Sequence, residues 1–546
     1  MQTRALSAET SQHRKVEKTA SIETPLTPLI ATACDACKRS VAGMAHIAGQ
    51  WLIGLCHDAW ATFLAIVDPA PGYGSARPVK RWGKRLAARD GLMARPGRAS
   101  IAAVTLPLAR RRTTAPAKDP FMPPTPILSG PRPKHLPSLQ ALVQGLSPGE
   151  RVFLPGSTGE PPGLTDALFN AGAVPLDITA SYVPGVNAVP VARFTSGTTY
   201  TSMFAQPTIA EAQATGVVRH LPLSYNTFAR HMQANLAFDA TIVHVAPPDA
   251  NGMCSLGLAV EFTAIAVRKS KRILAVINPR NPKIPNSPAL PLSSFDAVTE
   301  IDAPLRTYDV GQPSGQADAI AGLLAHFVED GVTLQIGIGK VPDALMSRLT
   351  DRRGLKLFSG MLSDGARSLV ESGSLDRSFQ HTCCLHLGTA GYYDWVRDRR
   401  EFLVRGCDYT HAATVLAGLP RLVSVNSALS VDLFGQANLE MLGGRMVSGC
   451  GGAPDFARGA QLSDGGVSII ALPSTAGREA ATRIVARLDA IATLPRTDVD
   501  VVVTEHGFAD LRGRSVMERA ERIIAIAAPQ HRSTLADAWR DMARRI

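Results

Sequence analysis

The chain has 546 residues, of which 45% are hydrophobic and 19% are charged, a composition typical of soluble globular proteins. This length exceeds what one hydrophobic core supports and predicts about three structural units. The formal net charge is +11, but residues 1–135 hold 20 Lys and Arg against 8 Asp and Glu, which gives +12 there and −1 over the rest. The neutral main body argues against nucleic-acid binding by that part of the chain.

The N-terminal residues 1–135 differ from the rest of the chain. Residues 69–134 are rich in Pro and Arg, which predicts a linker or disordered tract that buries little apolar surface. Residues 44–67 are apolar but contain His46, His57 and Asp58, so we expect an amphipathic helix there and no integral membrane span. This basic extension could bind a partner or a membrane surface, or be dispensable, and we favour the last interpretation.

The eight cysteines are mostly scattered through apolar segments, which favours a reducing, cytoplasmic location over a disulfide framework. Cys34 and Cys37 form a Cys-x-x-Cys pair, but no second pair accompanies them. Zinc at Cys383 and Cys384 with His381 and His386 is conceivable, although the spacing matches no standard ligand set. We therefore expect no metal.

A strand, a glycine turn and a helix occur twice. Residues 149–156 predict a strand that is followed by a helix over 164–170, and residues 331–337 predict a strand that is followed by a helix over 341–349. The two copies suggest two related α/β domains.

Apolar runs between and after these units predict further strands, and they alternate with helical stretches as in parallel sheets. We expect strands over 240–245, 272–277, 421–425, 467–472 and 499–504, and helices over 320–327, 476–488 and 533–545. A proline-rich connection at 279–291 leaves the first unit. We therefore predict an extension over 1–135, a first α/β domain over 136–310 and a second over 311–546.

Residues 448–452 form a glycine-rich segment with Gly449, Gly451 and Gly452. Several backbone N–H groups there could be presented to an anion or a developing oxyanion. The alternative is a loop whose glycines serve only its turns. Cys450 lies within the segment, and a helix N-terminus could lower the pKa of such a thiol.

Eight segments, in this order, resemble the acetyl-CoA hydrolase/4-hydroxybutyrate CoA-transferase family, a branch of the class I CoA-transferases. They are residues 156–161, 245–257, 337–344, 361–365, 426–436, 448–460, 469–475 and 503–513. The resemblance begins near Ser147 and continues to the C-terminus, and it leaves residues 1–135 outside.

The resemblance implies two tandem open α/β domains with the active site in the cleft between them. It implies a CoA thioester and a carboxylic acid as substrates, in acetate or carboxylate metabolism, with no metal. Members of the family use a glutamate that attacks the thioester, and a glycine-rich loop that holds the oxyanion. By position this loop contains Gly449, Gly451 and Gly452, while Gly337 and Gly339 belong to a second glycine turn of the CoA site. A homodimer is compatible with the family, but the sequence leaves the oligomeric state open.

The sequence departs from the family pattern at the nucleophile. Gly360 occupies the position of the glutamate, so a covalent route through that residue is closed. His411 stands where the family has an asparagine, and an imidazole there could act as a general base toward water. Val467 replaces a usual lysine. The alternative is a catalytically silent CoA-binding homologue with a regulatory role.

Other acidic candidates have simpler interpretations. Asp364 is expected to cap the following helix, Glu371 lies near the vacant position, and Glu505 with His506 is expected to be structural or to line the cleft. A sugar-phosphate isomerase of related architecture is disfavoured, because the sequence offers no lysine and aspartate set for a phosphate.

Overall fold

The computed structural model describes residues 132–170, 173–312, 314–477 and 480–546. The predicted helix over 44–67 and the Cys34–Cys37 pair lie outside these ranges. Lys134 and His135, which end the predicted extension, form strand β1. Within the described ranges, no helix combines the length and the apolar character that a membrane span requires.

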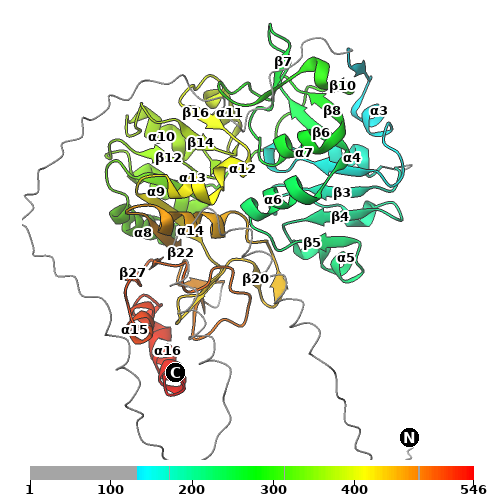
Figure 1. Ribbon diagram of the computed structural model, residues 1–546. Coiled ribbons are helices and arrows are strands. Elements are labelled where there is room, and N and C mark those ends of the chain that lie inside the picture. The colour runs from blue at the N-terminus through cyan, green and yellow to red at the C-terminus, as the bar shows by residue number, and fades with distance from the viewer. Residues whose placement is uncertain (1–131, 171–172, 313, 478–479) are drawn as a thin grey trace, which may run out of the picture. The chain divides into compact units, whose positions relative to one another are not determined.

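The first sheet contains eight parallel strands from residues 134–300 (Figure 1). In spatial order they are β1 (Lys134–His135), β10 (Ala297–Glu300), β8 (Ser270–Ile277), β6 (Phe238–Val245), β2 (Arg151–Leu154), β3 (Asp177–Ala180), β4 (Thr199–Ser202) and β5 (Val218–His220). The central strands β6 and β2 are almost entirely buried, as expected for parallel strands that are covered on both faces.

Five helices accompany this sheet: α3 (Leu139–Val143), α4 (Leu164–Leu168), α5 (Ala210–Ala214), α6 (Tyr225–Asn235) and α7 (Thr263–Lys269). Helix α6 is the one that reaches the site described below. Its N-cap is Ser224, whose hydroxyl accepts a hydrogen bond from the N–H of Thr227. Its buried face contains Tyr225, Phe228 and Met232.

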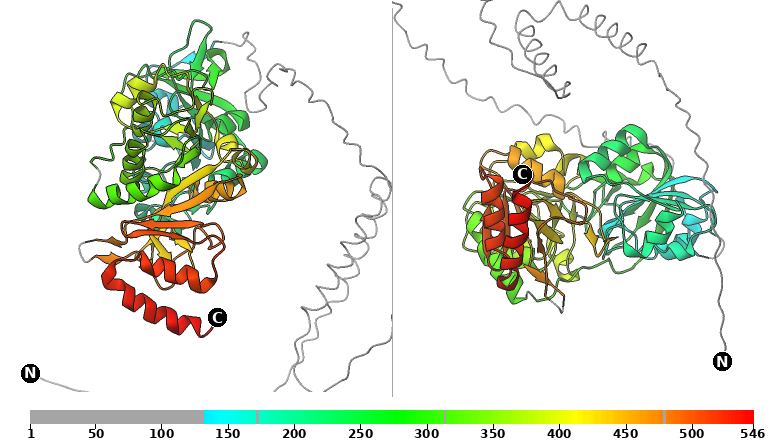
Figure 2. Two further views of the ribbon diagram at one scale, coloured as in Figure 1. Left: turned by 90° about the vertical axis from the view of Figure 1, so that its left-hand side faces the viewer. Right: turned by 90° about the horizontal axis from the view of Figure 1, so that it is seen from below.

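The second sheet contains six strands, which are parallel except for the last. In spatial order they are β12 (Lys356–Leu357), β11 (Thr333–Ile336), β17 (Leu422–Ser427), β22 (Val467–Ala471), β26 (Val501–Thr504) and β27 (Gly507–Asp510). The longer helices of this half are α8 (Gly315–Leu324), α9 (Lys340–Arg348), α10 (Gly365–Glu371), α14 (Ala453–Leu462), α15 (Val516–Ala525) and α16 (Arg532–Ala543). Helices α15 and α16 pack side by side at the C-terminus (Figures 1 and 2).

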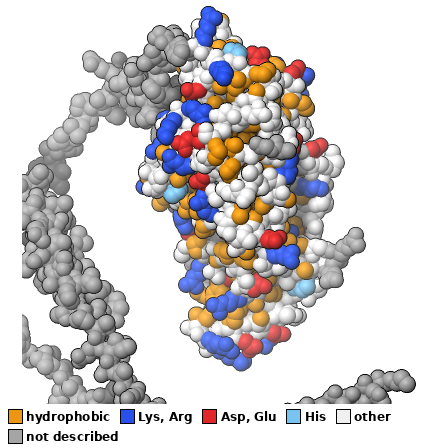
Figure 3. Space-filling view, turned by 90° about the vertical axis from the view of Figure 1, so that its right-hand side faces the viewer, with side chains coloured by type: hydrophobic (Ala, Val, Ile, Leu, Met, Phe, Trp, Pro, Cys, Tyr) orange, Lys and Arg blue, Asp and Glu red, His pale blue; other side chains and the backbone are white. Residues whose placement is uncertain are grey.

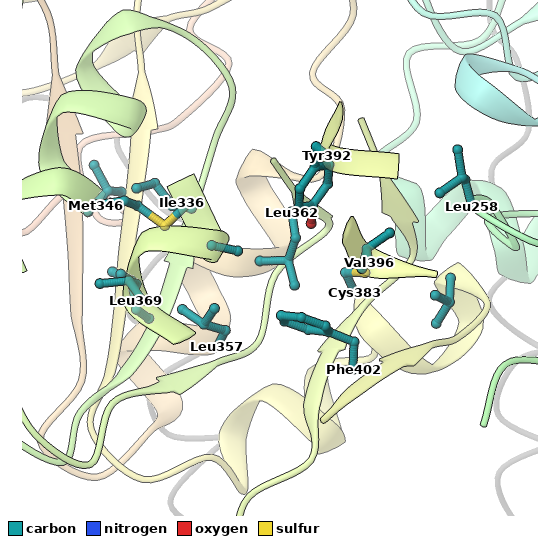
Figure 4. Packing of buried hydrophobic residues seen from close by; sticks show 14 of the residues in the cluster. Leu258, Ile336, Met346, Leu357, Leu362, Leu369, Cys383, Tyr392, Val396 and Phe402 are labelled. Carbon is teal, nitrogen blue, oxygen red and sulfur yellow. The ribbon is translucent and has the colours of Figure 1, made fainter. Parts of the chain in front are cut away.

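The predicted α/β class with open, mostly parallel sheets is confirmed. Both predicted strand–turn–helix units are present, as β2 followed by α4 and as β11 followed by α9. One cluster of buried apolar residues draws on both halves, from Leu258 in the first to Ile336, Leu362 and Phe402 in the second (Figure 4). The domain boundary near residue 310 stays a prediction.

One predicted helix is wrong. Where a helix was expected over 476–488, the described residues form the short strands β23 (Thr475–Ala476), β24 (Ala481–Thr482) and β25 (Ile484–Val485). Strand β23 pairs with β24 as a hairpin, and β25 pairs with β18 (Ser430–Asp432). The β-branched residues in these strands favour extended backbone, and the pairing overrides the alanine content that suggested a helix.

The surface of the main body carries both signs of charge. On the face shown in Figure 3, basic and acidic side chains are interspersed with apolar ones. This agrees with a net charge near zero beyond residue 135.

Candidate active site

The glycine-rich loop, residues 448–452, connects strand β21 (Arg445–Met446) to helix α14 and is fixed by the first half of the chain. The N–H of Tyr225 donates to the carbonyl oxygen of Gly451 at 3.1 Å. Gly449 packs against the backbone of Met203 and Phe204, and a Cβ atom at this position would collide with the Met203 carbonyl oxygen. Gly451 has φ +57°, a conformation that favours glycine. Close packing and a left-handed backbone therefore explain two of the glycines.

The loop offers unused hydrogen-bond donors. The backbone N–H groups of Gly449, Gly451 and Gly452 donate no hydrogen bond to any other residue of the described ranges. They stand just before the N-terminus of the ten-residue helix α14, whose dipole favours negative charge. Such a group of donors can stabilise an oxyanion.

The structure brings Gly360 and His411 together beside this loop. Gly360 follows β12, and His411 ends the short helix α12 (Cys407–Thr410). A Cβ atom placed on Gly360 would lie 3.1 Å from Nε2 of His411, and one placed on Gly452 would lie 2.5 Å from the same atom. The imidazole therefore fills the space next to both glycines.

His411 is held in a closed environment. Its side chain is 1% exposed, and its ring centroid lies 4.7 Å from that of Tyr225 and 4.8 Å from that of Phe456. Nδ1 lies 2.9 Å from the hydroxyl oxygen of Thr410. Burial lowers the pKa of His411 to about 3, so the imidazole is neutral near pH 7 and is a weak base in the free protein.

Gly337 and Gly339 lie at the carboxyl end of β11, next to the carboxyl end of β12, which precedes Gly360. Ser359 connects the two ends, because its hydroxyl donates to the carbonyl oxygen of Ile336 at 2.8 Å. The predicted glycine turn thus stands at the edge of the sheet where parallel α/β proteins bind ligands.

Cys384 and Cys407, a pair that the sequence did not predict, lie beside Gly360 and His411. Strands β14 (His381–Cys383) and β16 (Phe402–Val404) pair in parallel, so Cys384 and Cys407, which follow them, come close together. One ligand atom each from Cys384, Cys407 and His411 lies within 4.8 Å of the others, and all three residues are buried. The thiol of Cys384 donates to the Gly360 carbonyl oxygen at 2.8 Å.

Glu261 adds a buried carboxyl to this neighbourhood. Its N–H donates to the carbonyl oxygen of Cys384 at 3.3 Å, and its own carbonyl oxygen accepts from the N–H of Cys407 at 2.9 Å. Neither carboxyl oxygen has a hydrogen-bond partner of regular geometry among the described residues, although the Ser181 hydroxyl offsets part of the pKa shift. Burial raises the pKa of Glu261 to about 8.

Sequence reasoning missed Glu261 and Cys407, and it considered Cys384 only together with Cys383 and the neighbouring histidines. The four-residue spacing of Cys407 and His411, about one helical turn, was a signal in the sequence that could have linked two of the group. Glu261 carries no local signal, because only the fold brings it to residues more than a hundred positions later.

The remaining thiol and histidine candidates do not converge. Burial raises the pKa of Cys450 to about 12, so the expectation of an activated thiol is wrong. Cys383 lies in the apolar cluster of Figure 4, with its Sγ 3.6 Å from Nε2 of His386. His381 accepts the N–H of Leu357 instead of facing Cys384.

The acidic candidates take structural positions. Asp364 does not cap its own helix, because its carboxylate accepts hydrogen bonds from the N–H and the hydroxyl of Thr389, at the start of helix α11 (Ala390–Val396). Glu371 forms an exposed ion pair with Arg367. Glu505 accepts hydrogen bonds from the N–H and the hydroxyl of Ser474.

Comparison with known proteins places the chain in a family. Residues 388–539 match the acetyl-CoA hydrolase/transferase C-terminal domain. The chain is 31% identical over 421 residues to the 4-hydroxybutyrate coenzyme A transferase of Clostridium kluyveri. This match covers 74% of this chain and 97% of that protein. It is 27% identical to the acetyl-CoA hydrolase of Kluyveromyces lactis, over 58% of this chain and 68% of that one. The structure of RipA from Yersinia pestis superposes with a TM-score of 0.69 at 27% identity, over 75% of this chain and 98% of that chain. The chain therefore belongs to the acetyl-CoA hydrolase/CoA-transferase family.

Proposed function

We propose that this protein binds short-chain acyl-CoA thioesters and cleaves them, by hydrolysis or by transfer of CoA to a carboxylate, in acetate or carboxylate metabolism. The observation that carries the proposal is the set of unused N–H donors at Gly449, Gly451 and Gly452, next to the His411 imidazole. When a nucleophile attacks a thioester, the carbonyl oxygen becomes negatively charged, and such donors stabilise it. The names of the relatives, a CoA transferase and an acetyl-CoA hydrolase, support the same chemistry.

Hydrolysis is the reaction that this site favours. Gly360 has no side chain to form a covalent intermediate, and we therefore propose water as the nucleophile. We assign to His411 the activation of this water. The water oxygen bonds to the carbonyl carbon, the carbon–sulfur bond breaks, and the proton taken from water passes to the departing CoA thiolate. Since burial disfavours the imidazolium, a protonated His411 would be a strong acid toward that thiolate.

Turnover of several short acyl-CoAs by the purified full chain tests the proposal, with and without acetate or succinate as acceptor. We expect CoA release without acceptor, and a loss of at least about 100-fold in His411→Ala, the range general acid–base catalysis covers. His244→Asn is the matched control, because His244 is also buried and hydrogen bonds with Asn278. Strict dependence on the acceptor would overturn the hydrolase assignment.

A catalytically silent CoA-binding homologue is the second candidate, and Gly360 is the observation that favours it. Calorimetric titration with CoA separates the two. Saturable binding without turnover of any acyl-CoA would establish the silent protein, whereas binding with turnover supports the enzyme. Cytoplasmic localisation and a homodimer stay predictions from the sequence.

A further inference from the structure

The strongest unexplained feature of the molecule is the buried group of Cys384, Cys407 and His411. Two thiols and an imidazole are ligands of zinc and similar borderline-soft cations, and catalytic zinc sites use three protein ligands, including sets of two cysteines and one histidine. Their ligand atoms lie within 4.8 Å of one another. Ideal zinc bonds place such atoms about 3.5–3.8 Å apart, a contraction that small rotations of the side chains provide.

The surroundings of the group suit a metal ligand set. The Thr410 hydroxyl donates to the Gly406 carbonyl oxygen at 3.3 Å, so its oxygen can accept the Nδ1–H of His411 and leave the Nε2 lone pair for a ligand. Backbone hydrogen bonds join Glu261 to both Cys384 and Cys407. These bonds fix the backbones of the two cysteines relative to each other.

A second observation concerns the buried carboxyl of Glu261. Both carboxyl oxygens of Glu261 are buried and lack a hydrogen bond of regular geometry within the described ranges, where the Ser181 hydroxyl interacts with the carboxyl, and the residue itself is 1% exposed. Its backbone has φ +36°, which is uncommon for a residue with a side chain. An unsatisfied buried carboxyl requires an explanation, and a nearby ion is one of the accepted ones.

We propose that Cys384, Cys407 and His411 bind one divalent cation of the zinc class, with the Glu261 carboxyl beside it. This inference rests on the proposed function in one respect: the ion would supply a bound water as the nucleophile that Gly360 lacks. His411 would then serve as a ligand instead of a free base. The water oxygen bonds to the thioester carbonyl carbon, the carbon–sulfur bond breaks, and the proton of the water ends on the CoA thiolate.

Metal content tests the site independently of turnover. The test protein is the full chain with the substitutions Cys34→Ser and Cys37→Ser, so that this pair cannot contribute ligands. It is incubated with Zn²⁺ and desalted. Elemental analysis should find about one zinc per chain. Cys384→Ser and Cys407→Ser should each weaken zinc binding at least about 100-fold, and Glu261→Gln about 10-fold or more.

Cys383→Ser is the matched control, because Cys383 adjoins Cys384 but lies in the apolar core, and it should bind zinc as the parent does. Loading the parent chain with Co²⁺ gives a readout that does not depend on variants that fail to fold. Thiolate-to-cobalt charge-transfer absorption and intense ligand-field bands are expected from a tetrahedral site with sulfur ligands.

Several outcomes would overturn the site: no retained zinc, equal retention by the Cys384 and Cys383 variants, a cobalt spectrum without charge transfer, or a disulfide between Cys384 and Cys407. The two proposals fail separately. Zinc binding without thioester cleavage would refute the proposed function and leave the metal site standing. Cleavage by the metal-free protein that is lost in His411→Ala would refute the role of the metal and support the free imidazole.

Discussion

Exchanging two residues should recover a family-type nucleophile in this protein. In Gly360→Glu alone, the new Cβ atom meets Nε2 of His411 at 3.1 Å, a distance at which one of the two groups must shift. His411→Asn removes the imidazole and introduces the amide that the family resemblance places there. We expect acceptor-dependent CoA transfer in the double variant and much less in Gly360→Glu alone.

The size of the effect follows from the packing. Overfilling a closed site costs about 1–3 kcal/mol. If that strain opposes the productive position of the glutamate, the single variant is about 5- to 150-fold slower than the double variant. His411→Asn itself loses two aromatic contacts, with Tyr225 and Phe456, each worth about 0.5–1.5 kcal/mol. The double variant should therefore be destabilised by less than the sum of the single variants.

Exchange of labelled acetate into acyl-CoA measures CoA transfer. Urea unfolding of the parent, the two single variants and the double variant measures the coupling free energy, which is the difference between the destabilisation of the double variant and the sum for the single variants. A coupling above about 1 kcal/mol supports mutual exclusion of the two side chains. Additivity within about 0.5 kcal/mol, the usual result for independent sites, would refute the reasoning. Equal exchange rates in Gly360→Glu and the double variant would refute it as well.

Two further predictions concern the loop and the helix that follows it. Gly449→Ala should reduce turnover by about 10²–10³-fold, because its methyl group would collide with the Met203 carbonyl oxygen and shift the N–H donors of the loop. Gly315→Ala, with open space around it, should have the parent rate. Asp455 accepts hydrogen bonds from the Ser224 hydroxyl at 2.6 Å and from a backbone N–H, and burial raises its pKa to about 6 from 3.8. The folded state therefore binds the Asp455 proton more tightly than the unfolded state does. As the pH rises from 4 to 6, the parent should lose up to about 3 kcal/mol of unfolding free energy relative to Asp455→Asn. Above pH 6 the difference should stay constant. Urea unfolding across this range measures the difference, and a flat difference would contradict the burial of this carboxyl.

The sheets were well predicted because buried parallel strands have a local signal in the sequence. Continuous apolar runs mark β6, β22 and β26, and glycine turns mark the start of α9. The helix predicted over residues 476–488 was wrong because alanine content favours a helix only weakly. Pairing with distant residues made the described part of this segment into strands.

The candidate site was only partly predictable. The glycine-rich loop was visible from its composition, and the changes at Gly360 and His411 were visible from the family resemblance. Their mutual contact was not, because it depends on the side-chain direction at the end of α12. Cys384 and Glu261 meet only after β14, β16 and the segment before α7 (Thr263–Lys269) are assembled, and no sequence spacing encodes that meeting.

The hold of helix α6 on the glycine-rich loop also determines when the site can exist during protein synthesis. Ser224 and Asp455 are 231 residues apart in the sequence, yet their hydrogen bond helps to fix the loop. A growing chain that has released α6 from the ribosome must add more than two hundred residues before the partner of this helix emerges. The polar start of α6 therefore lacks this partner while the next 231 residues are made. Folding of the site comes late, as expected for contacts of high sequence separation.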